Sequence, residues 1–255
     1  MNSEQRTDWE NTGRWYDQIV GQEGHYYHRQ IVLPKLLPLL DLGSFDSPSL
    51  LDLACGQGIL ARQLPPEVPY WGVDLAPSLI AAAKKKCPKN HHFLVGDICK
   101  PLPVDKQDFT HAAIVLALQN VAHPEKALLN ASRHLREGGV LALVLNHPCF
   151  RIPRQSAWGV DAAKKLQYRR IDAYLSPQKI PIQMHPGKGK ASETTWSFHH
   201  SISDFSKFLA DAGFAILLIE EWVSDKTSTG HTAKMENRAR AEFPLFLTFL
   251  AQKIA

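Results

Sequence analysis

The stretch Leu50-Leu51-Asp52-Leu53-Ala54-Cys55-Gly56-Gln57-Gly58 decides the fold of this chain. Its first half is an apolar run typical of a buried strand. The glycines at its end permit a tight turn and let the backbone approach a ligand with no side chain in between. A helix is predicted from about Ile59 onward. The order of strand, glycine turn and helix indicates a ligand-binding turn at the carboxyl end of a strand in an α/β sheet.

Short apolar runs recur along the rest of the chain, with helical patterns between them. This alternation is typical of βαβ units and of a parallel sheet covered by helices on both faces. The predicted strands are Ser49 to Ala54, Tyr70 to Val73, His92 to Val95, Thr110 to Leu116, Val140 to Leu145, Phe214 to Val223 and Phe243 to Ala251. The sequence therefore predicts a single α/β domain.

Proline, serine and glycine mark the predicted helices between these strands. These helices are Leu79 to Lys86 after Pro77, Glu125 to Leu135 after Pro124, and one that carries Phe205, Phe208 and Leu209 between a Ser201 or Ser203 cap and Gly213. Two stretches, Asp8 to Asp41 and Cys149 to Ser197, do not fit the alternation. The second is rich in proline and glycine, which predicts an irregular insertion with at most a short helix near Ala162 to Ile171.

Composition narrows the class of protein. The 255 residues are 44% hydrophobic and 21% charged with a net charge of +4, which indicates a globular chain and does not call for a nucleic-acid partner. No apolar run is long enough to insert into a membrane, and the polar residues Met1 to Glu10 are unlike a signal peptide, so a cytoplasmic location is expected. The 4 cysteines form no C-x-x-C pair, so we expect buried free thiols, with no metal site and no disulfide.

The glycine turn has two interpretations. Gly56 and Gly58 also satisfy a relaxed dinucleotide fingerprint, and Asp74 falls at about the spacing of the acid that binds the ribose of NAD. The acid Asp52 lies inside the strand just before the turn, where its charge disfavours a pyrophosphate and suits an ammonium group. S-adenosylmethionine carries an ammonium group and no phosphate.

Four ordered segments resemble class I S-adenosylmethionine-dependent methyltransferases, especially the small-molecule type 11 group. They are Asp52-x-Ala54-Cys55-Gly56-x-Gly58, Gly72-Val73-Asp74-Leu75-Ala76, Gly96-Asp97-Ile98 and Leu135-Arg136-Glu137-Gly138-Gly139-Val140-Leu141. The resemblance covers most of residues 10 to 148 and the closing segment Ser201 to Lys253. It implies a Rossmann-like, doubly wound, seven-stranded α/β sheet, mostly parallel with one antiparallel strand near the C-terminus, plus a cap insertion. In one departure, Thr110 follows Phe109 where the family usually has an acid.

The resemblance also implies how the methyl donor is held. Asp74 would accept hydrogen bonds from the ribose hydroxyls, and Asp97 from the adenine amino group while Leu75 and Ile98 pack on the ring. Donor contacts are expected from the positions Tyr16, Asp52, Ala54, Gly56, Gly58, Asp74, Leu75, Asp97, Ile98, Val115 and Leu116. Taken singly, Asp52 is also explained as an internal anchor for the loop, and Asp74 or Asp97 as a helix cap or turn residue.

Histidines at the two ends of the insertion are the candidates for a general base. His147 directly follows the predicted strand Val140 to Leu145, and His199 and His200 precede the late helix. Most of the 12 histidines of the chain must be ordinary surface or capping residues, so each candidate is weighed against that explanation. The basic residues Arg151, Arg154, Lys164, Lys165, Arg169, Arg170, Lys179, Lys188 and Lys190 face only two acids, Asp161 and Asp172, in the same stretch. This charge would attract an anionic acceptor, although a solvated loop explains it equally well.

The sequence thus predicts a methyltransferase that uses S-adenosylmethionine, yields S-adenosylhomocysteine and methylates a small-molecule acceptor. The resemblance favours O- or C-methylation of an aromatic, quinone-like or polyketide-like compound. A nucleic-acid methyltransferase and a donor-binding module without catalysis are the alternatives, and the oligomeric state stays open. The expected division is a helical lid (1–46), a donor-binding core (47–148), a cap insertion (149–197) and the end of the core (198–255).

Overall fold

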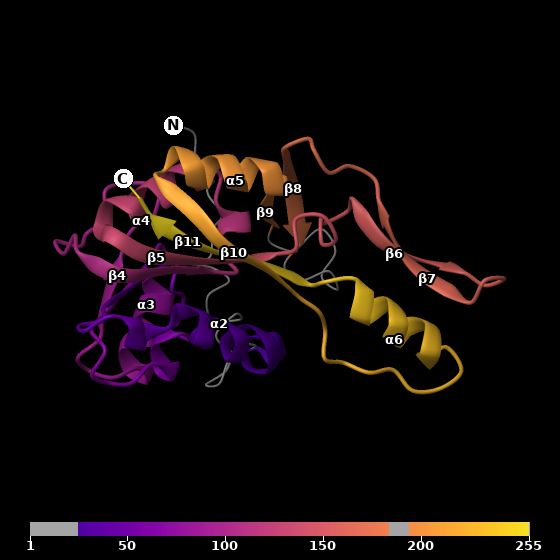
Figure 1. Ribbon diagram of the computed structural model, residues 1–255, viewed down its shortest axis with the longest axis horizontal. Coiled ribbons are helices and arrows are strands. Elements are labelled where there is room, and N and C mark those ends of the chain that lie inside the picture. The colour runs from indigo at the N-terminus through magenta and orange to yellow at the C-terminus, as the bar shows by residue number, and fades with distance from the viewer. Residues whose placement is uncertain (1–24, 184–193, 255) are drawn as a thin grey trace.

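A seven-stranded sheet forms the centre of the molecule in the computed structural model, which describes residues 25–183 and 194–254 (Figure 1). Its strand order is β10-β11-β5-β4-β1-β2-β3. The strands are β1 (Leu50–Leu53), β2 (Tyr70–Asp74), β3 (His92–Val95), β4 (Phe109–Val115), β5 (Leu135–Asn146), β10 (Phe214–Trp222) and β11 (Phe246–Lys253). Strand β11 runs antiparallel to both of its neighbours, and the other pairings are parallel. The predicted doubly wound α/β fold with one antiparallel strand is confirmed.

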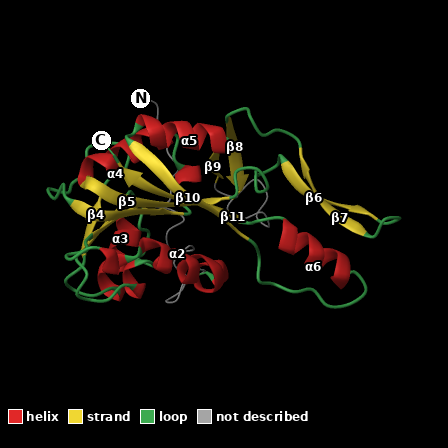
Figure 2. Cartoon of the chain, in the orientation of Figure 1, coloured by secondary structure: helices red, strands yellow, loops and turns green. Residues whose placement is uncertain are grey.

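Helices cover both faces of this sheet (Figure 2). Helices α2 (Leu33–Leu40) and α3 (Pro77–Lys86) lie on one face, and α4 (Pro124–His134) and α5 (Ile202–Asp211) lie on the other. Helix α5 begins with a capping box, in which the Ser201 side chain accepts from the Asp204 amide and the Asp204 carboxylate accepts from the Ser201 amide. Ser201, one of the two predicted candidates, is therefore the cap.

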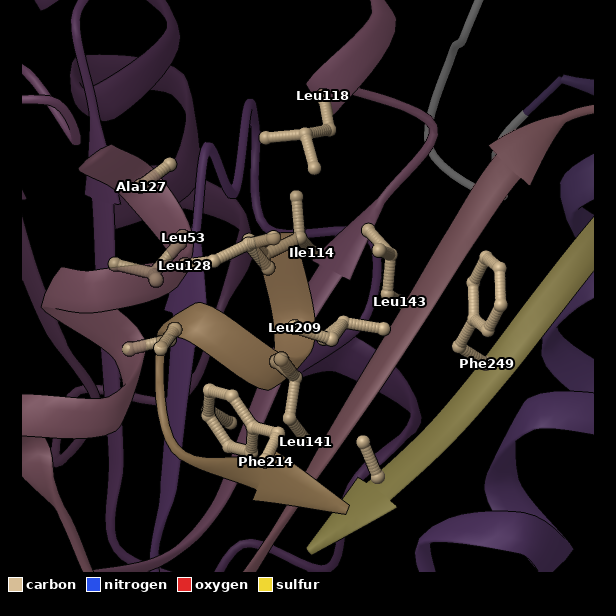
Figure 3. Packing of buried hydrophobic residues seen from close by; sticks show 14 of the residues in the cluster. Leu53, Ile114, Leu118, Ala127, Leu128, Leu141, Leu143, Leu209, Phe214 and Phe249 are labelled. Carbon is tan, nitrogen blue, oxygen red and sulfur yellow. The ribbon is translucent and has the colours of Figure 1, made fainter. Parts of the chain in front are cut away.

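The alternation of side chains along the strands produces two cores, one on each face. In β5, Leu141, Leu143 and Leu145 pack toward α4 and α5, whereas Ala142 and Val144 pack into the cluster that contains α2 and α3. Figure 3 shows the first cluster, where Leu128 of α4 and Leu209 of α5 meet strand residues such as Ile114. Each large side chain buried in this way stabilises the fold by about 1.5–3 kcal/mol relative to exposure.

The predicted helix after the glycine turn is wrong. A series of turns follows Gly58 and leads into a short 3-10 helix, Ala61–Gln63. Pro65 and Pro66 explain the difference, because the ring of a proline disfavours helical conformation at the residue before it and a proline supplies no amide hydrogen. Leu64 accordingly adopts an extended conformation.

The insertion is more regular than expected and consists of two β-hairpins. Strands β6 (Ser156–Asp161) and β7 (Leu166–Ile171) pair antiparallel, as do β8 (Gln178–Gln183) and β9 (Thr194–His199). The short helix expected near Ala162 to Ile171 is wrong, because those residues form the hairpin turn and β7. The carboxylate of Asp161 accepts from the Lys164 amide, and Lys165 takes the left-handed conformation that closes the turn.

A second, unpredicted insertion separates β10 from β11 and contains α6 (Ala233–Glu242). Together with the β6–β7 hairpin it extends to one side of the sheet (Figure 1). Phe243, just after α6, makes edge contacts with Trp158 of β6 and with Phe150, at ring-centroid distances of 5.5 and 5.4 Å. The two insertions therefore pack against each other.

The described chain before β1 begins with a helical stretch. A π-helix, His28–Val32, leads directly into α2 and places Ile31 and Val32 in the core. Tyr16 lies outside the described residues. In the described part of the chain, no helix combines the length and the apolar character needed to cross a membrane.

Candidate functional site

Two neighbouring strands end in the same unusual backbone conformation. Ala54 follows β1 with φ of 61°, and Leu116 follows β4 with φ of 52°. Both are held by hydrogen bonds to the sheet, from the Ala54 amide to the Val73 carbonyl (2.7 Å) and from the Leu116 amide to the Val144 carbonyl (2.8 Å). Left-handed backbone at residues other than glycine costs free energy and is concentrated at functional sites. The carboxyl ends of β1 and β4 are thus the strained part of this sheet edge.

Glycine is needed at the two positions of the turn, Gly56 and Gly58, for different physical reasons. A side chain at Gly58 would place its Cβ 2.6 Å from the Cys87 Sγ and 3.1 Å from the Phe93 ring. Gly58 is therefore required by packing beneath the loop. A Cβ at Gly56 would meet nothing within 4 Å, so its backbone faces open space. Both residues have positive φ, but only Gly56 lies on the open side of the turn.

A pocket opens at this turn and encloses about 430 Å³ of empty space, part of it open to solvent. It is lined by His28, Leu33, Asp52, Ala54, Cys55, Gly56, Gln57, Ile59, Leu60 and Val115. Four of the predicted donor-site residues, Asp52, Ala54, Gly56 and Val115, thus surround one cavity. We call it the donor pocket.

Asp74 lies at the end of β2 and holds the glycine turn in place. Its carboxylate accepts hydrogen bonds from the Gly56 amide (2.8 Å) and the Ala76 amide (2.9 Å), through different oxygens. Asp74 therefore fixes the backbone of the glycine turn from the end of β2.

Asp97 follows β3, the strand next to β2, and a hydrogen bond from the Gly96 amide to the Asp74 carbonyl (2.9 Å) ties the two strand ends together. One oxygen of Asp97 accepts from the Cys99 amide (3.0 Å), as a turn residue does. Leu75 is 40% exposed and available to a flat ring, whereas Ile98 is buried in the core. Six of the predicted donor-site residues do not line the donor pocket: Gly58, Asp74, Leu75, Asp97, Ile98 and Leu116.

The structure changes the argument made for Asp52. Its carboxyl is buried and accepts a hydrogen bond from the Tyr70 hydroxyl (2.7 Å), and burial raises its pKa to about 7. The hydrogen bond from Tyr70 works in the opposite direction and lowers that pKa. Asp52 therefore carries less negative charge near neutral pH than the sequence argument assumed. It lines the donor pocket and anchors the strand at the same time.

His28 is a wall residue of the donor pocket that was not predicted as a contact. Its Nδ1 is buried without a hydrogen-bond partner, and burial lowers its pKa to about 4. A neutral imidazole with one unpartnered nitrogen is suited to a polar ligand group. The only sequence signal is its place after the aromatic pair Tyr26-Tyr27, which packs elsewhere, with the Tyr26 hydroxyl donating to Asp225 (2.8 Å).

A second recess, with about 390 Å³ of empty space partly open to solvent, lies beyond the end of β5. It is lined by Gln119, Leu145, Asn146, His147, Pro148, Arg151, Ile152, Pro153, Ser197, Phe198, His199, His200 and Phe205. The three candidate histidines from the two ends of the insertion thus line one cavity. We call it the cap recess.

His147 has both ring nitrogens occupied by protein partners. Its Nδ1 accepts from the amides of Cys149 (3.1 Å) and Phe150 (3.2 Å), so its Nε2 carries the hydrogen and donates to the Glu221 carboxylate (2.7 Å). Burial lowers the pKa of His147, and Glu221 opposes this. The geometry gives His147 a structural task, the joining of the chain after β5 to β10, and leaves no lone pair for an acceptor proton.

His199 and His200 are less constrained. The Nε2 of His199 donates to the Tyr174 carbonyl (2.6 Å), which makes its Nδ1 the basic nitrogen. The Nδ1 of His200 is buried without a partner, and its ring contacts those of Phe205 and Phe208. Burial lowers the pKa of His200, which keeps its imidazole neutral and able to accept a proton at neutral pH.

Gln119 connects the cap recess to the strained end of β4. Its Nε2 donates to the Leu116 carbonyl (2.7 Å), and the backbone carbonyl of Gln119 accepts from the Ser197 hydroxyl (3.4 Å). Its Oε1 is buried without a partner. Sequence reasoning missed this residue, since a glutamine in a loop after a strand carries no signal of its own.

The large aromatic residues of the insertion, Trp158, Tyr168, Tyr174 and Trp196, do not line the cap recess. Trp158 lies under the Arg169 guanidinium at 5.1 Å, and Trp196 lies under the Lys179 amine at 4.2 Å. The Tyr174 hydroxyl accepts from the Ile202 amide (3.0 Å), and Tyr168 is 42% exposed on β7. The apolar wall is formed instead by smaller and more buried residues of β5, β9 and α5.

The comparisons with known proteins agree with this geometry. Residues 51–143 match the family model Methyltransf_11, described as a methyltransferase domain. The chain is 33% identical over 114 residues to a demethylmenaquinone methyltransferase of Chlamydia caviae (41% of this chain and 49% of that protein). It is 29% identical over 150 residues to a 2-phytyl-1,4-naphtoquinone methyltransferase of Nostoc punctiforme (52% and 65%). The chain thus spans about half to two thirds of the length of the curated relatives it matches.

A solved structure has the same fold over nearly the whole chain. The S-adenosylmethionine-dependent methyltransferase from Mesorhizobium loti superposes with a TM-score of 0.68 at 22% identity, covering 91% of this chain and 100% of that one. The fold is thus that of S-adenosylmethionine-dependent methyltransferases. The family-model match spans residues 51–143, which contain all four of the motif segments recognised in the sequence.

Proposed function

We propose that this chain transfers a methyl group from S-adenosylmethionine to a small-molecule acceptor bound in the cap recess. The observation that carries the proposal is that both cavities lie at the same edge of the sheet, where the strands β1, β4 and β5 end. Ala54 and Val115, at the ends of β1 and β4, line the donor pocket, while Leu145 and Asn146, at the end of β5, line the cap recess. Parallel strands bring their carboxyl ends to one edge, where ligands of α/β sheets bind.

The donor would be held by the residues around the glycine turn. Asp74 accepts from the ribose hydroxyls, and Asp97 accepts from the adenine amino group beside Leu75. Ala54, Gly56, Val115 and Leu116 would hold the methionine portion, and Asp52 would pair with its ammonium group. When bound, S-adenosylmethionine supplies an electrophilic methyl group on a sulfonium.

The cap recess positions the acceptor and removes its proton. An acceptor hydroxyl donates toward His200, the candidate with an unpartnered nitrogen, and His199 is the second base candidate. With the donor bound, the acceptor oxygen would form the new bond to the methyl carbon, and the carbon–sulfur bond would break with its electron pair retained by sulfur. The proton passes to the histidine, and S-adenosylhomocysteine remains. An acceptor carbon would use the same alignment, which supplies much of the rate.

The acceptor class rests on the relatives. Two of them are quinone methyltransferases by name, which supports an aromatic or quinone-like acceptor, and we keep a polyketide-like acceptor alongside it. The apolar residues Leu145, Ile152 and Phe198 give the recess a wall suited to such a ring. Nucleic-acid methylation is the alternative, and the cytoplasmic location stays a prediction.

Calorimetry with S-adenosylhomocysteine and with NAD tests the donor assignment. We expect the first to bind and the second not to bind. Asp74→Ala should weaken S-adenosylhomocysteine at least tenfold, since charge-assisted hydrogen bonds contribute about 1.5–3 kcal/mol. Asp161→Ala, on the turn between β6 and β7, is the matched control. NAD binding, or unchanged affinity in a folded Asp74→Ala variant, would contradict the assignment.

Transfer of a labelled methyl group tests the activity itself. Aromatic hydroxy compounds and quinols should become labelled, whereas duplex DNA and transfer RNA should not. Salt-dependent labelling of nucleic acid would support the alternative. Donor binding with no transfer to any acceptor would leave a donor-binding module.

A further inference from the structure

The cap recess has an uncompensated positive charge. Among the described residues that line it, Arg151 is the one cation that is always charged, and no aspartate or glutamate is present. Burial lowers the pKa values of His147 and His200 beside it, which disfavours their charged forms. The recess therefore presents positive potential to whatever enters it.

Arg151 is held firmly but without a counter-charge. Its Nη1 donates to the Asn146 side-chain oxygen (2.7 Å), and its guanidinium lies 5.3 Å from the centre of the Phe246 ring. In the described part of the chain, no carboxylate forms an ion pair with it. Burial and the nearby Arg169 both oppose its charge. A partly buried guanidinium in this situation gains most from a ligand anion.

The other residues that line the recess indicate the chemistry of the rest of that ligand. Leu145, Ile152 and Phe198 form an apolar wall. The Gln119 Oε1 and the His200 Nδ1 are buried and unpartnered, and an acceptor oxygen such as Oε1 needs a donor from the ligand. A hydroxyl group satisfies this need.

We propose that the acceptor is an aromatic hydroxy acid whose carboxylate pairs with Arg151 while its hydroxyl faces Gln119 and His200. This inference rests on the proposed function and makes it narrower. Arg151 is then a specificity-determining residue that distinguishes an anionic acceptor from a neutral one, as a polar site does when its buried groups would otherwise stay unpaired.

The test compares acids with matched neutral amides on protein saturated with S-adenosylhomocysteine. The probes are 4-hydroxybenzoate and 3-hydroxy-2-naphthoate, each beside its carboxamide, with binding measured by calorimetry. We expect at least one acid to bind at least tenfold more tightly than its amide. In Arg151→Gln this preference should fall below threefold, and Arg151→Lys should restore part of it.

Arg170→Gln is the control, since this exposed arginine already pairs with Asp172 and should leave the preference unchanged. Equal binding of acid and amide to the unmodified protein, no binding of either acid, or an equal loss in Arg170→Gln would each overturn the proposal. S-adenosylhomocysteine affinity is measured in every variant. If the unmodified protein does not bind S-adenosylhomocysteine, the proposed function fails. If it binds S-adenosylhomocysteine but shows no preference for the acid over the amide, only the Arg151 assignment is overturned.

Discussion

Asp52 and Tyr70 form a buried pair whose protonation is coupled to the donor pocket. Burial raises the Asp52 pKa to about 7, while the Tyr70 hydroxyl favours its charged form. An ammonium group entering the pocket would favour the carboxylate further, so binding should release a proton. We therefore expect the affinity for S-adenosylhomocysteine to rise with pH between about 6 and about 8.

Calorimetry in buffers of different ionisation enthalpy measures this proton release directly. Asp52→Asn should bind more weakly and lose the pH dependence. Tyr70→Phe removes the hydrogen bond that stabilises the carboxylate, so its pH dependence should move to higher pH. A pH-independent affinity in the unmodified protein would mean that Asp52 is only an internal anchor.

The three recess histidines should respond differently to substitution. His200 has an unpartnered Nδ1, so His200→Gln should lower turnover by roughly 10²–10⁴-fold while donor affinity stays near normal. His147→Gln should instead lower stability, since it removes contacts to two backbone amides and to Glu221. Turnover and urea unfolding are measured on both variants, with His199→Gln beside them. Full turnover in His200→Gln and His199→Gln would leave positioning alone as the mechanism and would favour a carbon acceptor.

At the scale of elements, the two glycines of the turn have separate roles: Gly58 is needed for packing and Gly56 for the approach of a ligand. Gly58→Ala forces a Cβ against Cys87 at a residue with φ of 76° and should destabilise the fold by about 1–3 kcal/mol. Gly56→Ala adds a methyl group on the open side of the turn, so its main effect should be weaker binding of S-adenosylhomocysteine. Urea unfolding and calorimetry on both variants check this. An equal loss of stability in the two would show that both glycines serve packing alone.

The elements that the sequence predicted are those with strong local signals. The runs at Leu50–Leu53 and Leu141 to Leu145 are apolar along their whole length because helices cover both faces, and Pro77 and Pro124 mark the first turns of α3 and α4. The hairpin β6–β7 was missed because its side chains are half exposed, which gives no clear alternation. Helix α6 was missed although its many helix-forming residues and the Glu236–Arg240 pair four residues apart were available signals.

The site, like the elements, was predictable only where a local motif carries the signal. The position of Asp74 beside the glycine turn follows from the motif. The partners of His147 do not, because Glu221 lies 74 residues further along the chain. The open nitrogens of His28 and His200 and the unpaired charge of Arg151 depend on what folding leaves without a partner, which no local pattern records.

For the whole molecule, buried histidines should make stability fall in acid. Burial lowers the pKa values of His28 and His111 to about 4. Between pH 6.5 and 4 the unfolded chain binds protons that the folded chain does not, so the free energy of unfolding decreases as pH falls. Asp52, with its raised pKa, acts in the opposite direction between pH 7 and 4, since the folded state keeps a proton that the unfolded state loses.

The two histidines together should change the free energy of unfolding more than the one aspartate does, so we expect the urea midpoint to drop between pH 7 and pH 5. His111→Gln, at the end of the sheet remote from the site, should reduce the size of that drop. Urea unfolding followed by circular dichroism over this pH range measures both. A midpoint that stays level or rises toward pH 5 would show that the buried histidines do not control acid stability.

The antiparallel strand β11 has a consequence for how the protein is made on the ribosome. Strand β10 joins the sheet only through β11, which comes later in the chain, after α6. Until β11 emerges from the ribosome, the long strand β5 keeps an open edge beside apolar residues, and such an edge invites pairing with other chains. Synthesis that stalls within the second insertion would therefore release an aggregation-prone nascent chain, and the time taken to translate residues 223–253 sets how long chaperones must protect it.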